Sequence, residues 1–433
     1  MNELKKGKLI ALLPILVFLV VYLGVALIYR DAYAMPVVVA FLVAITVACF
    51  QNKDVKFDDK LELMARGVGD KNIITMILIF LAAGIFAGVV GRGSAESVAY
   101  FMLSIVPAQF AVAVLFVVAC FVSTAMGTSC GTITLIIPIA VAVAEASGFD
   151  LALCVGSVIG GAMFGDNLSF ISDTTIAACN SQGCAMKDKF KANFWIALPA
   201  AIATLILIVV ISMQADVAQQ ITKDYDLIQL IPYVLVLAGG IAGVNVFLVL
   251  LVGIVSGAAI MLGTGATTFQ ALLASTGSGA SGMFETILVA ILVSAMCGLI
   301  RAYGGFDALL YQIQRVFKGN KGGQLGMGML VAAMDVATAN NTVAIVMAGP
   351  IAREMAETYD ITPQRSASIL DTFSCIVQGV LPYGAQMLYA VGAVSALGGA
   401  ITAFDILPYL FYPYLLLVSC LAAIFLVKNK KAK

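Results

Sequence analysis

The sequence predicts an all-α polytopic membrane protein, and three observations lead to that prediction. Hydrophobic residues make up 62% of the 433 residues and charged residues only 11%, whereas soluble domains average about 45–50% and about 25%. The apolar residues form blocks of about 18–22 residues, the length at which a helix crosses a bilayer. These blocks lack the strict polar and apolar alternation of a membrane β-barrel. Soluble enzymes, nucleic-acid binders and secreted disulfide scaffolds are therefore excluded.

The elements follow from these blocks in chain order. A polar, amphipathic linker over 51–72 separates the first two spans from the rest. Two further crossings, over 151–180 and 366–390, carry polar residues at their centres. The apolar blocks predict full spans over 9–29, 35–50, 73–91, 193–213, 227–245, 246–262, 284–301 and 405–427.

An internal repeat relates the two halves of the chain. At a shift of about 210 positions, Thr128 and Thr132 fall on Thr338 and Thr342, and span 73–91 falls on 284–301. At a shift of about 205, Asp166 falls on Asp371. The predicted organisation begins with two spans and a linker (1–72), followed by a first repeat (73–213). Connecting spans (214–283) lead to a second repeat (284–427) and a basic tail (428–433). Within the connecting region, we expect the Gly-rich stretch 275–282 to be a flexible outer loop.

Basic clusters fix the predicted sides, because loops rich in Lys and Arg stay in the cytoplasm. Lys5, Lys6 and Lys8 place the N-terminus inside, and the tail places the C-terminus inside. If 109–146 and 325–356 return to the side they left, every basic cluster falls inside, Lys187, Lys189 and Lys191 included, and the repeats are inverted. Since polar backbone is tolerated at depth only inside protein or a water cavity, we expect re-entrant hairpins there. The fold prediction is about ten transmembrane crossings plus two hairpins, each repeat having a discontinuous helix.

Two carboxylates interrupt the predicted crossing of the first half. Asp166 and Asp173 are seven residues apart, a spacing that returns to the same face of a continuous helix. An Asp at the centre of a membrane helix costs about 2.5–3.5 kcal/mol. Unwound carbonyls and side-chain oxygens bind Na⁺ in transporters, so we predict a Na⁺ site; the alternative is hydrogen bonding between packed helices. The cation-binding or proton-binding candidates are Asp166, Asp173, Ser169, Ser172, Thr174 and, by the repeat, Asp371, with Asp166 and Asp173 as the Na⁺ ligands.

The hairpin tips are the second set of candidates. Their amides and the helix N-termini beside them could bind an anionic group, although Asn and Thr are also ordinary turn residues. Asp335 lies just before the second tip and is either a titrating group or a cap. The tip candidates for substrate binding are Thr128, Ser129, Thr132, Thr338, Asn340, Asn341 and Thr342.

Several chemistries are absent from the sequence. The chain has no His, so His-based haem, zinc and proton-relay chemistry is excluded. The nine Cys show no metal-ligand spacing and read as small apolar residues. No ATP-binding motif or nucleophile–base pair occurs, so we expect no enzyme activity and no cofactor, with an ion gradient as the energy source.

The polar motifs resemble those of a known family. The stretch from Gly127 to Thr132 and the stretch from Phe164 to Thr175 resemble the NhaC family of Na⁺/H⁺ antiporters, part of the ion transporter superfamily. The resemblance covers about 70–425. Cys130 stands where the family usually has Trp, and Phe170 where it usually has Pro. The resemblance implies inverted repeats, a site in a bacterial cytoplasmic membrane, and either ion exchange or, as in some relatives, transport of amino acids or organic acids.

Two functions remain open at the level of sequence. The first is Na⁺/H⁺ antiport by alternating access, with Na⁺ and H⁺ competing for Asp166 and Asp173. The second is a Na⁺-coupled symporter of an amino acid or small carboxylate, which the Asn340–Asn341 amide pair favours. A channel is disfavoured by the paired, interrupted repeats. The expected partners are membrane lipid, Na⁺, and H⁺ or a small organic substrate; nucleic acid is excluded, and a homodimer is left open.

Overall fold

The computed structural model describes the chain except for residues 1–6, 30–34, 171, 216–224, 243 and 427–433. The described part contains helices and no strand, which confirms the all-helical character of the predicted fold class. The basic tail and the first lysines lie outside the described residues. The helices of the first half are α1 (Leu13–Tyr29), α2 (Val37–Phe50), α3 (Phe57–Val68), α4 (Lys71–Ile105), α5 (Ala111–Met126), α6 (Ser129–Ser147), α7 (Leu151–Leu168), α8 (Asp173–Gln182) and α9 (Met186–Gln214).

The second half has the same all-helical character. Three short 3₁₀ turns occur in the described chain, at Leu9–Leu12, Ala108–Phe110 and Leu407–Tyr409. The remaining helices are α10 (Leu227–Ile241), α11 (Val246–Gly263), α12 (Phe269–Gly282), α13 (Phe284–Ala302), α14 (Gly305–Val316), α15 (Gly319–Thr338), α16 (Asn341–Thr358), α17 (Pro363–Val380), α18 (Ala385–Ala396), α19 (Ala403–Ile406) and α20 (Phe411–Phe425).

The described residues contain seven helical stretches long and apolar enough to cross a membrane, or eight if the bent pair Ala403–Tyr409 and Phe411–Phe425 is one span. Shorter apolar helices, Leu9–Tyr22, Val37–Phe50 and Leu227–Gly239, fall where the sequence predicts full spans. The chain is therefore a multi-span membrane protein. The predicted total of about ten crossings counts these shorter helices and the polar, broken ones as well.

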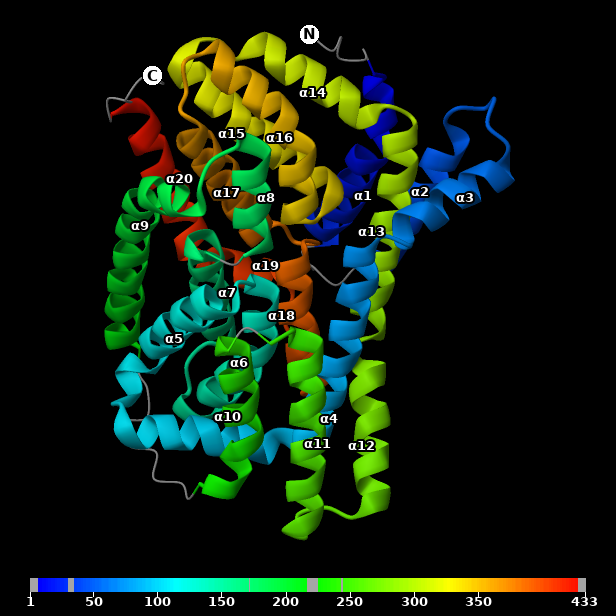
Figure 1. Cartoon of the computed structure of the whole chain (residues 1–433). Coiled ribbons are helices and arrows are strands. Elements are labelled where there is room, and N and C mark those ends of the chain that lie inside the picture. Colours follow the sequence, from blue (N-terminus) through cyan, green and yellow to red (C-terminus); the bar gives the residue numbers. More distant parts are fainter. Residues whose placement is uncertain (1–6, 30–34, 171, 216–224, 243, 427–433) are drawn as a thin grey trace.

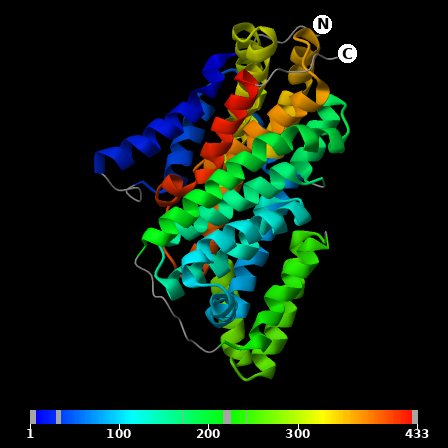
Figure 2. The ribbon, with the colours of Figure 1, turned by 90° about the vertical axis from the view of Figure 1, so that its left-hand side faces the viewer.

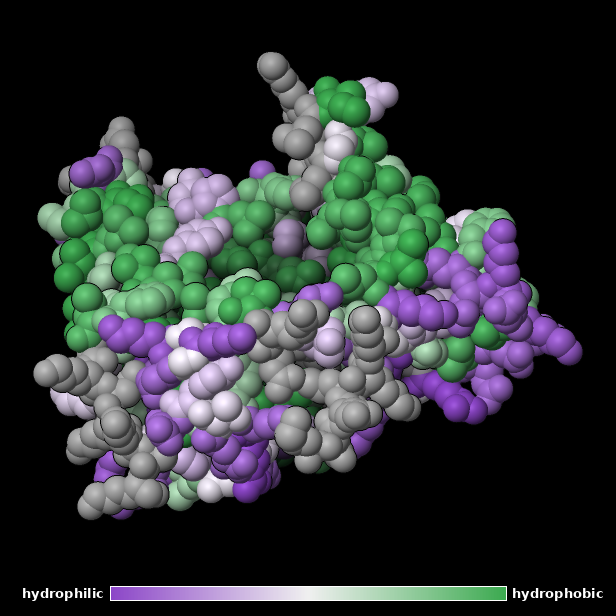
Figure 3. Space-filling view, turned by 90° about the horizontal axis from the view of Figure 1, so that it is seen from above, coloured by the Kyte–Doolittle hydropathy of each residue, from purple (hydrophilic) through white to green (hydrophobic). Residues whose placement is uncertain are grey.

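The outer surface of the spans is apolar, as lipid requires. On α9, Trp195 is 73% exposed and Ile206 is 58% exposed, and Val255 of α11 is 69% exposed. Figure 2 shows α9 running along the flank beside α20, where the Ser419 hydroxyl donates to the Ile196 carbonyl at 2.6 Å. Figure 3 shows hydrophilic side chains gathered instead at the end nearest the termini, at one side over α3 and the loop before it and again in a second area away from them.

The two halves repeat the same helix boundaries at one constant spacing of 212 residues. The first hairpin ends α5 at residue 126 and begins α6 at 129; the second ends α15 at 338 and begins α16 at 341. The broken helix of the first half ends at 168 and resumes at 173; that of the second half ends at 380 and resumes at 385.

This spacing corrects the register that we read from the sequence. Asp166 corresponds to Gln378, and Thr128 corresponds to Asn340, so the matches at shifts of about 205 and 210 join residues that are not equivalent. The reason is local chemistry: Thr and Asn both cap helices, so neither residue type marks a unique position in a repeat.

The corresponding elements lie in opposite halves of the molecule (Figure 1). The α5–α6 hairpin, α7 and α18 occupy the lower half in that view, whereas the α15–α16 hairpin, α17 and α8 occupy the upper half. The C-terminal part of α4 lies across the bottom, and α14 lies across the top. The two broken helices therefore run in opposite directions, and their breaks meet near the centre.

The Gly-rich stretch 275–282 is helical, contrary to the flexible outer loop that we expected. It forms most of α12, which packs against α4. A Cβ atom built on Gly279 would lie 2.1 Å from the Gly84 carbonyl oxygen, and one built on Gly84 would lie 2.2 Å from the Gly279 carbonyl oxygen. The glycines thus permit backbone-to-backbone packing of two membrane helices, which a reading of Gly and Ser as loop residues misses.

Candidate functional site

The tip of the first hairpin is set by a glycine and a capping threonine. Gly127 ends α5 with φ 69°, the left-handed conformation that glycine adopts without strain. Thr128, the residue just before α6, caps the helix: its hydroxyl accepts the Gly131 N–H at 3.3 Å. The first residue of α6, Ser129, is 2% exposed. The tip therefore presents the N-terminus of α6 and a buried hydroxyl toward the centre of the protein.

The tip of the second hairpin has the same construction with other residues. Ala339 takes the left-handed conformation with φ 51°, although it is not a glycine. Asn340 caps α16, its Oδ1 accepting the Val343 N–H at 3.0 Å. A non-glycine residue in this region is uncommon and costs energy, so the surrounding contacts must hold the tip in place. One such contact is the Gln378 amide, which donates to the Ala339 carbonyl at 2.7 Å.

Asp166 lies at the break of the first discontinuous helix and is 3% exposed. α7 ends at Leu168 and α8 begins at Asp173, so the predicted continuous-helix spacing of the two carboxylates does not apply. Ser129 donates its hydroxyl to Asp166 Oδ2 at 2.6 Å. Ser172 donates to Asp166 Oδ1 in a short hydrogen bond, and Thr174 lies 3.4 Å from the same oxygen.

The hydroxyl groups around Asp166 belong to a larger network. Ser172 and Thr174 share a hydrogen bond of 2.6 Å between their hydroxyl oxygens. Ser129 also accepts the Gln386 amide, at 3.0 Å, from α18 of the other broken helix. One carboxylate is therefore contacted from the first hairpin and from the far side of its own helix break, and through Ser129 it is linked to the second half.

A cavity of about 140 Å³ joins these groups. It is bordered by both hairpin tips and by the start of α8, where Asp173 is exposed. Of the residues singled out in the sequence, the cavity is lined by Thr128, Ser129, Asp166, Ser172, Asp173, Thr174, Asn340, Asn341 and Thr342. Carboxylate and hydroxyl oxygens with two helix N-termini suit a small hydrated cation or a small anion.

The other predicted site residues lie outside this cavity. Thr132 donates to the Thr128 carbonyl at 2.9 Å, and Ser169 donates to the Thr124 carbonyl at 2.9 Å. Thr338 donates to the Met334 carbonyl at 2.8 Å, within its own helix. Asp371 is fully buried, but it faces a different partner.

Asp371 forms an ion pair with Lys189, which the sequence had suggested was one of several cytoplasmic lysines. The Lys189 side chain is 1% exposed and the Asp371 side chain is 0% exposed. Lys189 also donates to the Asn167 carbonyl at 2.6 Å and to the Thr175 hydroxyl at 2.9 Å. It thus connects α9, α17, the end of α7 and the start of α8. A cation at the C-terminal end of α7 is also favourable to the helix dipole.

Asp335 is the third buried carboxylate of the core. Ser374 donates to its Oδ1 at 3.2 Å, while its Oδ2 has no hydrogen-bond partner in the described part of the chain. Of the buried carboxylates Asp166, Asp335 and Asp371, only Asp371 pairs with a buried ammonium group of the described chain, that of Lys189. Lys60 is the other buried lysine of the described chain, but it bonds the carbonyls of Cys49 and Gln51 beside α2.

The whole chain is similar to known ion exchangers. The model of the Na⁺/H⁺ antiporter family matches residues 4–213 and 227–429. The chain is 24% identical over 420 residues to the Na⁺/H⁺ antiporter NhaC of Alkalihalophilus pseudofirmus, covering 88% of this chain and 87% of that one. It is 25% identical over 389 residues to the NhaC of Bacillus subtilis, covering 80% and 83%.

Two further similarities are to a protein matched over about half of its length and to a solved structure. The malate-2H⁺/Na⁺-lactate antiporter of Bacillus subtilis is 28% identical over 210 residues, which are 48% of this chain and 45% of that protein. A solved structure, the antimetabolite efflux pump MtrF of Neisseria gonorrhoeae, aligns with a TM-score of 0.42 at 12% identity, covering 95% of this chain and 94% of that one. The family match over nearly the whole chain confirms the resemblance seen in the polar motifs: the protein belongs to the Na⁺/H⁺ antiporter family.

Proposed function

We propose that the protein exchanges Na⁺ for H⁺, with Asp166 as the group that binds the two ions alternately. The observation that carries the proposal is the environment of this carboxylate. It is buried, it is contacted by three hydroxyl groups, and it lines a cavity enclosed by the tips of both hairpins. Asp173, exposed at the same cavity, supplies a second oxygen ligand as the cation enters.

The exchange follows from the charge of one buried group. Na⁺ favours the ionised carboxylate, whereas burial favours the protonated form, so each ion displaces the other. Ser129, Ser172 and Thr174 can donate to a carboxylate or turn their oxygen lone pairs toward a cation. The same side chains therefore stabilise Asp166 in both loaded states.

The charge balance of the core supports cation coupling. Asp371 is paired with the buried Lys189, whereas Asp166 and Asp335 are buried without an ion-pair partner among the described residues, and an uncompensated buried charge costs several kcal/mol. Protons or Na⁺ must supply the missing positive charge. Asp335, with one unpaired oxygen, is the second group we assign to proton binding.

We infer alternating access from the arrangement of the two halves. The constant spacing of helix boundaries and the opposite directions of the two broken helices support inverted repeats with hairpin tips meeting at the membrane centre. We place about ten crossings and two re-entrant hairpins in a bacterial cytoplasmic membrane, with both termini in the cytoplasm. Motion of one half against the other would open the cavity to each side in turn.

The test is exchange in liposomes that contain the purified protein and a trapped pH dye. An inward Na⁺ pulse at clamped voltage should make the lumen alkaline, because each entering Na⁺ drives protons out. Asp166→Asn should abolish the response, while Glu357→Gln, an exposed carboxylate that pairs with Arg353, should leave it intact. Absence of a response in the unaltered protein would contradict the proposal.

A second candidate is Na⁺-coupled symport of an amino acid or small carboxylate. The observation that favours it is the pair of amides, Asn340 and Asn341, at the same cavity, since a bare cation exchanger needs no such pair. The malate-2H⁺/Na⁺-lactate antiporter among the relatives is named as an organic-acid exchanger. Na⁺-driven uptake of such a solute without any pH response would favour this function over exchange.

A further inference from the structure

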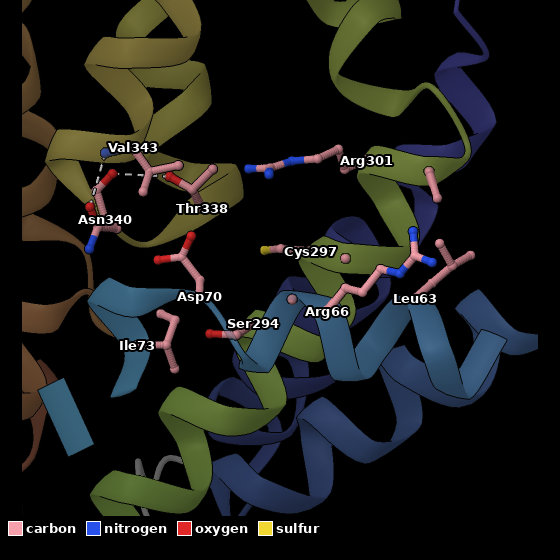
Figure 4. A pocket seen from close by; sticks show the side chains of 13 residues that line it. Leu63, Arg66, Asp70, Ile73, Ser294, Cys297, Arg301, Thr338, Asn340 and Val343 are labelled. Carbon is pink, nitrogen blue, oxygen red and sulfur yellow. Dashed lines mark hydrogen bonds between the residues drawn. The ribbon is translucent and has the colours of Figure 1, made fainter. Parts of the chain in front are cut away.

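A second and larger cavity, of about 380 Å³, lies beside the Asp166 cavity (Figure 4). It is formed by α3, the start of α4, α13 and the second hairpin. Two arginines and one aspartate, Arg66, Arg301 and Asp70, carry its charge. Arg66 is already paired with Glu62 at 2.6 Å, so Arg301 and Asp70 are the charged groups that face the cavity. A volume within about 300–1,000 Å³ is typical of a small-molecule site.

The two arginines are held by helices that touch at their backbones. Arg66 precedes Gly67 on α3, and Arg301 follows Gly298 by three residues on α13. A Cβ atom on Gly67 would lie 2.4 Å from the Ser294 carbonyl oxygen, and one on Gly298 would lie 2.5 Å from the Leu63 carbonyl oxygen. Because there is no space between these backbones, the cavity wall that carries both cations is fixed.

Of the two arginines that line the cavity, Arg301 makes no ion pair with a described residue. Arg66 donates to Glu62 at 2.6 Å along its own helix. The recorded contact of Arg301 is a weak one, from Nη2 to the Met347 sulfur at 3.5 Å. Figure 4 shows its side chain extending across the cavity toward Thr338. A guanidinium group offers five N–H donors in a fork that matches a carboxylate.

The far wall of the cavity is the tip of the second hairpin. Thr338 and Asn340 line it, and Asn340 also lines the Asp166 cavity. A ligand held by Arg301 would therefore lie next to the segment that borders the cation site. Arg301 extends from one wall of the cavity, and Asn340 and the Asp70 carboxylate lie at the opposite wall, so an anion would be held on the Arg301 side.

We propose that this cavity binds a small organic anion through a carboxylate group, with Arg301 as its partner and Asn340 at the opposite wall. The site is distinct from the Asp166 site and does not depend on Na⁺/H⁺ exchange. It gives the protein a second ligand class, in a position from which the ligand would contact the second hairpin tip.

The experiment is calorimetric titration of the purified full chain in neutral detergent with succinate as its Tris salt, in the absence of Na⁺. Saturable binding is expected in the unaltered protein. Arg301→Gln should weaken it at least about tenfold, the loss expected from one charge-assisted pair. Arg301→Lys should fall between the two, because it keeps the charge and loses the fork. Arg353→Gln, an exposed arginine outside the cavity, is the matched control and should bind as the unaltered protein does.

Two further arms identify the source of the anion. Titration with inorganic phosphate, and thermal stability in nanodiscs with and without phosphatidylglycerol, test a phosphate group in place of the carboxylate. Binding of either that depends on Arg301, without binding of succinate, would overturn the proposal, as would equal succinate affinity in Arg301→Gln. Asp166→Asn should bind succinate normally, so failure here is distinguishable from failure of the exchange function.

Discussion

At the scale of single residues, the hydroxyl groups around Asp166 decide how well a cation competes with a proton. Ser172 lies in the helix break and donates to one carboxylate oxygen, and Ser129 donates to the other. Ser172 precedes α8 at its N-cap position, outside the regular helix, and its side chain faces the carboxylate. Its contribution can be measured alone.

Ser172→Ala removes one oxygen from the cation site without changing the carboxylate. Loss of a supporting group at a metal site typically costs about 10–100-fold in affinity, so the apparent KM for Na⁺ in liposome exchange should rise at least about tenfold. Ser104→Ala is the control, because Ser104 is exposed and its hydroxyl donates to the Phe101 carbonyl, outside the cavity. Equal KM values for Ser172→Ala and the unaltered protein would contradict a role for Ser172 in cation binding.

Lys189→Gln tests the buried ion pair. Removing one partner leaves Asp371 uncompensated, a loss of about 3–5 kcal/mol in the free energy of unfolding. Lys187→Gln, two residues earlier on the same helix and exposed, should change stability little. Both are measured by denaturant unfolding in detergent. The double variant Lys189→Gln/Asp371→Asn should recover part of the loss; a double variant as unstable as the sum of the singles would show that the pair does not interact.

Lys189 also shows where the sequence was read too coarsely. We grouped it with Lys187 and Lys191 as a cytoplasmic cluster, because the three lysines alternate over five positions. The helical period would have separated them: Lys189, Asn193, Ile196 and Ala200 share one buried face of α9. That signal was available, but its partner Asp371 lies 182 positions away, and no local pattern reveals a contact at that distance.

At the scale of elements, close packing of glycines fixes the contact between α4 and α12. Gly279 and Gly84 face each other at a separation with no room for a methyl group, whereas Gly277 on the same helix has nothing within 4 Å of its built Cβ. Gly279 and Gly277 are two residues apart on the same helix, and Gly279 faces the backbone of α4 whereas Gly277 faces open space.

Gly279→Ala should therefore destabilise the protein by about 1–3 kcal/mol, the usual cost of overpacking. Gly277→Ala should be neutral or slightly stabilising, because Ala exceeds Gly in helix propensity by up to about 1 kcal/mol. Thermal unfolding in detergent checks both variants. Equal melting temperatures would contradict the packing described for α4 and α12.

The interruptions of the helices were largely predictable from sequence, whereas their register was not. Gly127 and the polar tip at Asn340 indicated where the hairpins turn, and Pro382 lies in the break between α17 and α18. A capping Thr and a capping Asn satisfy the same backbone groups, so matching identical letters placed Asp371, rather than Gln378, opposite Asp166. Geometry resolves this because equivalent positions share a conformation, as Gly127 and Ala339 do.

At the scale of the whole molecule, the proposed membrane topology requires the two ends of the structure to face opposite sides of the membrane. The loop between α11 and α12 lies at one end, and the junction of α14 and α15 lies at the other (Figure 1). Thr264 and Lys318 are exposed positions at these two places.

In a cysteine-free background, Thr264→Cys should react with a membrane-impermeant maleimide added to intact cells. Lys318→Cys should react only after the cells are permeabilised, since the basic residues near it predict the cytoplasmic side. Labelling of both variants from the same side would contradict the inferred topology.

The central claim is that Na⁺ and H⁺ compete for one carboxylate, and calorimetric Na⁺ titration over a pH series tests it most directly. Na⁺ affinity should fall as the pH is lowered, by up to about tenfold per pH unit for one proton per cation. Titration in two buffers of different ionisation enthalpy should reveal proton release on binding. Asp166→Asn should abolish both effects. Na⁺ binding that releases no proton, or that persists unchanged in Asp166→Asn, would contradict the account.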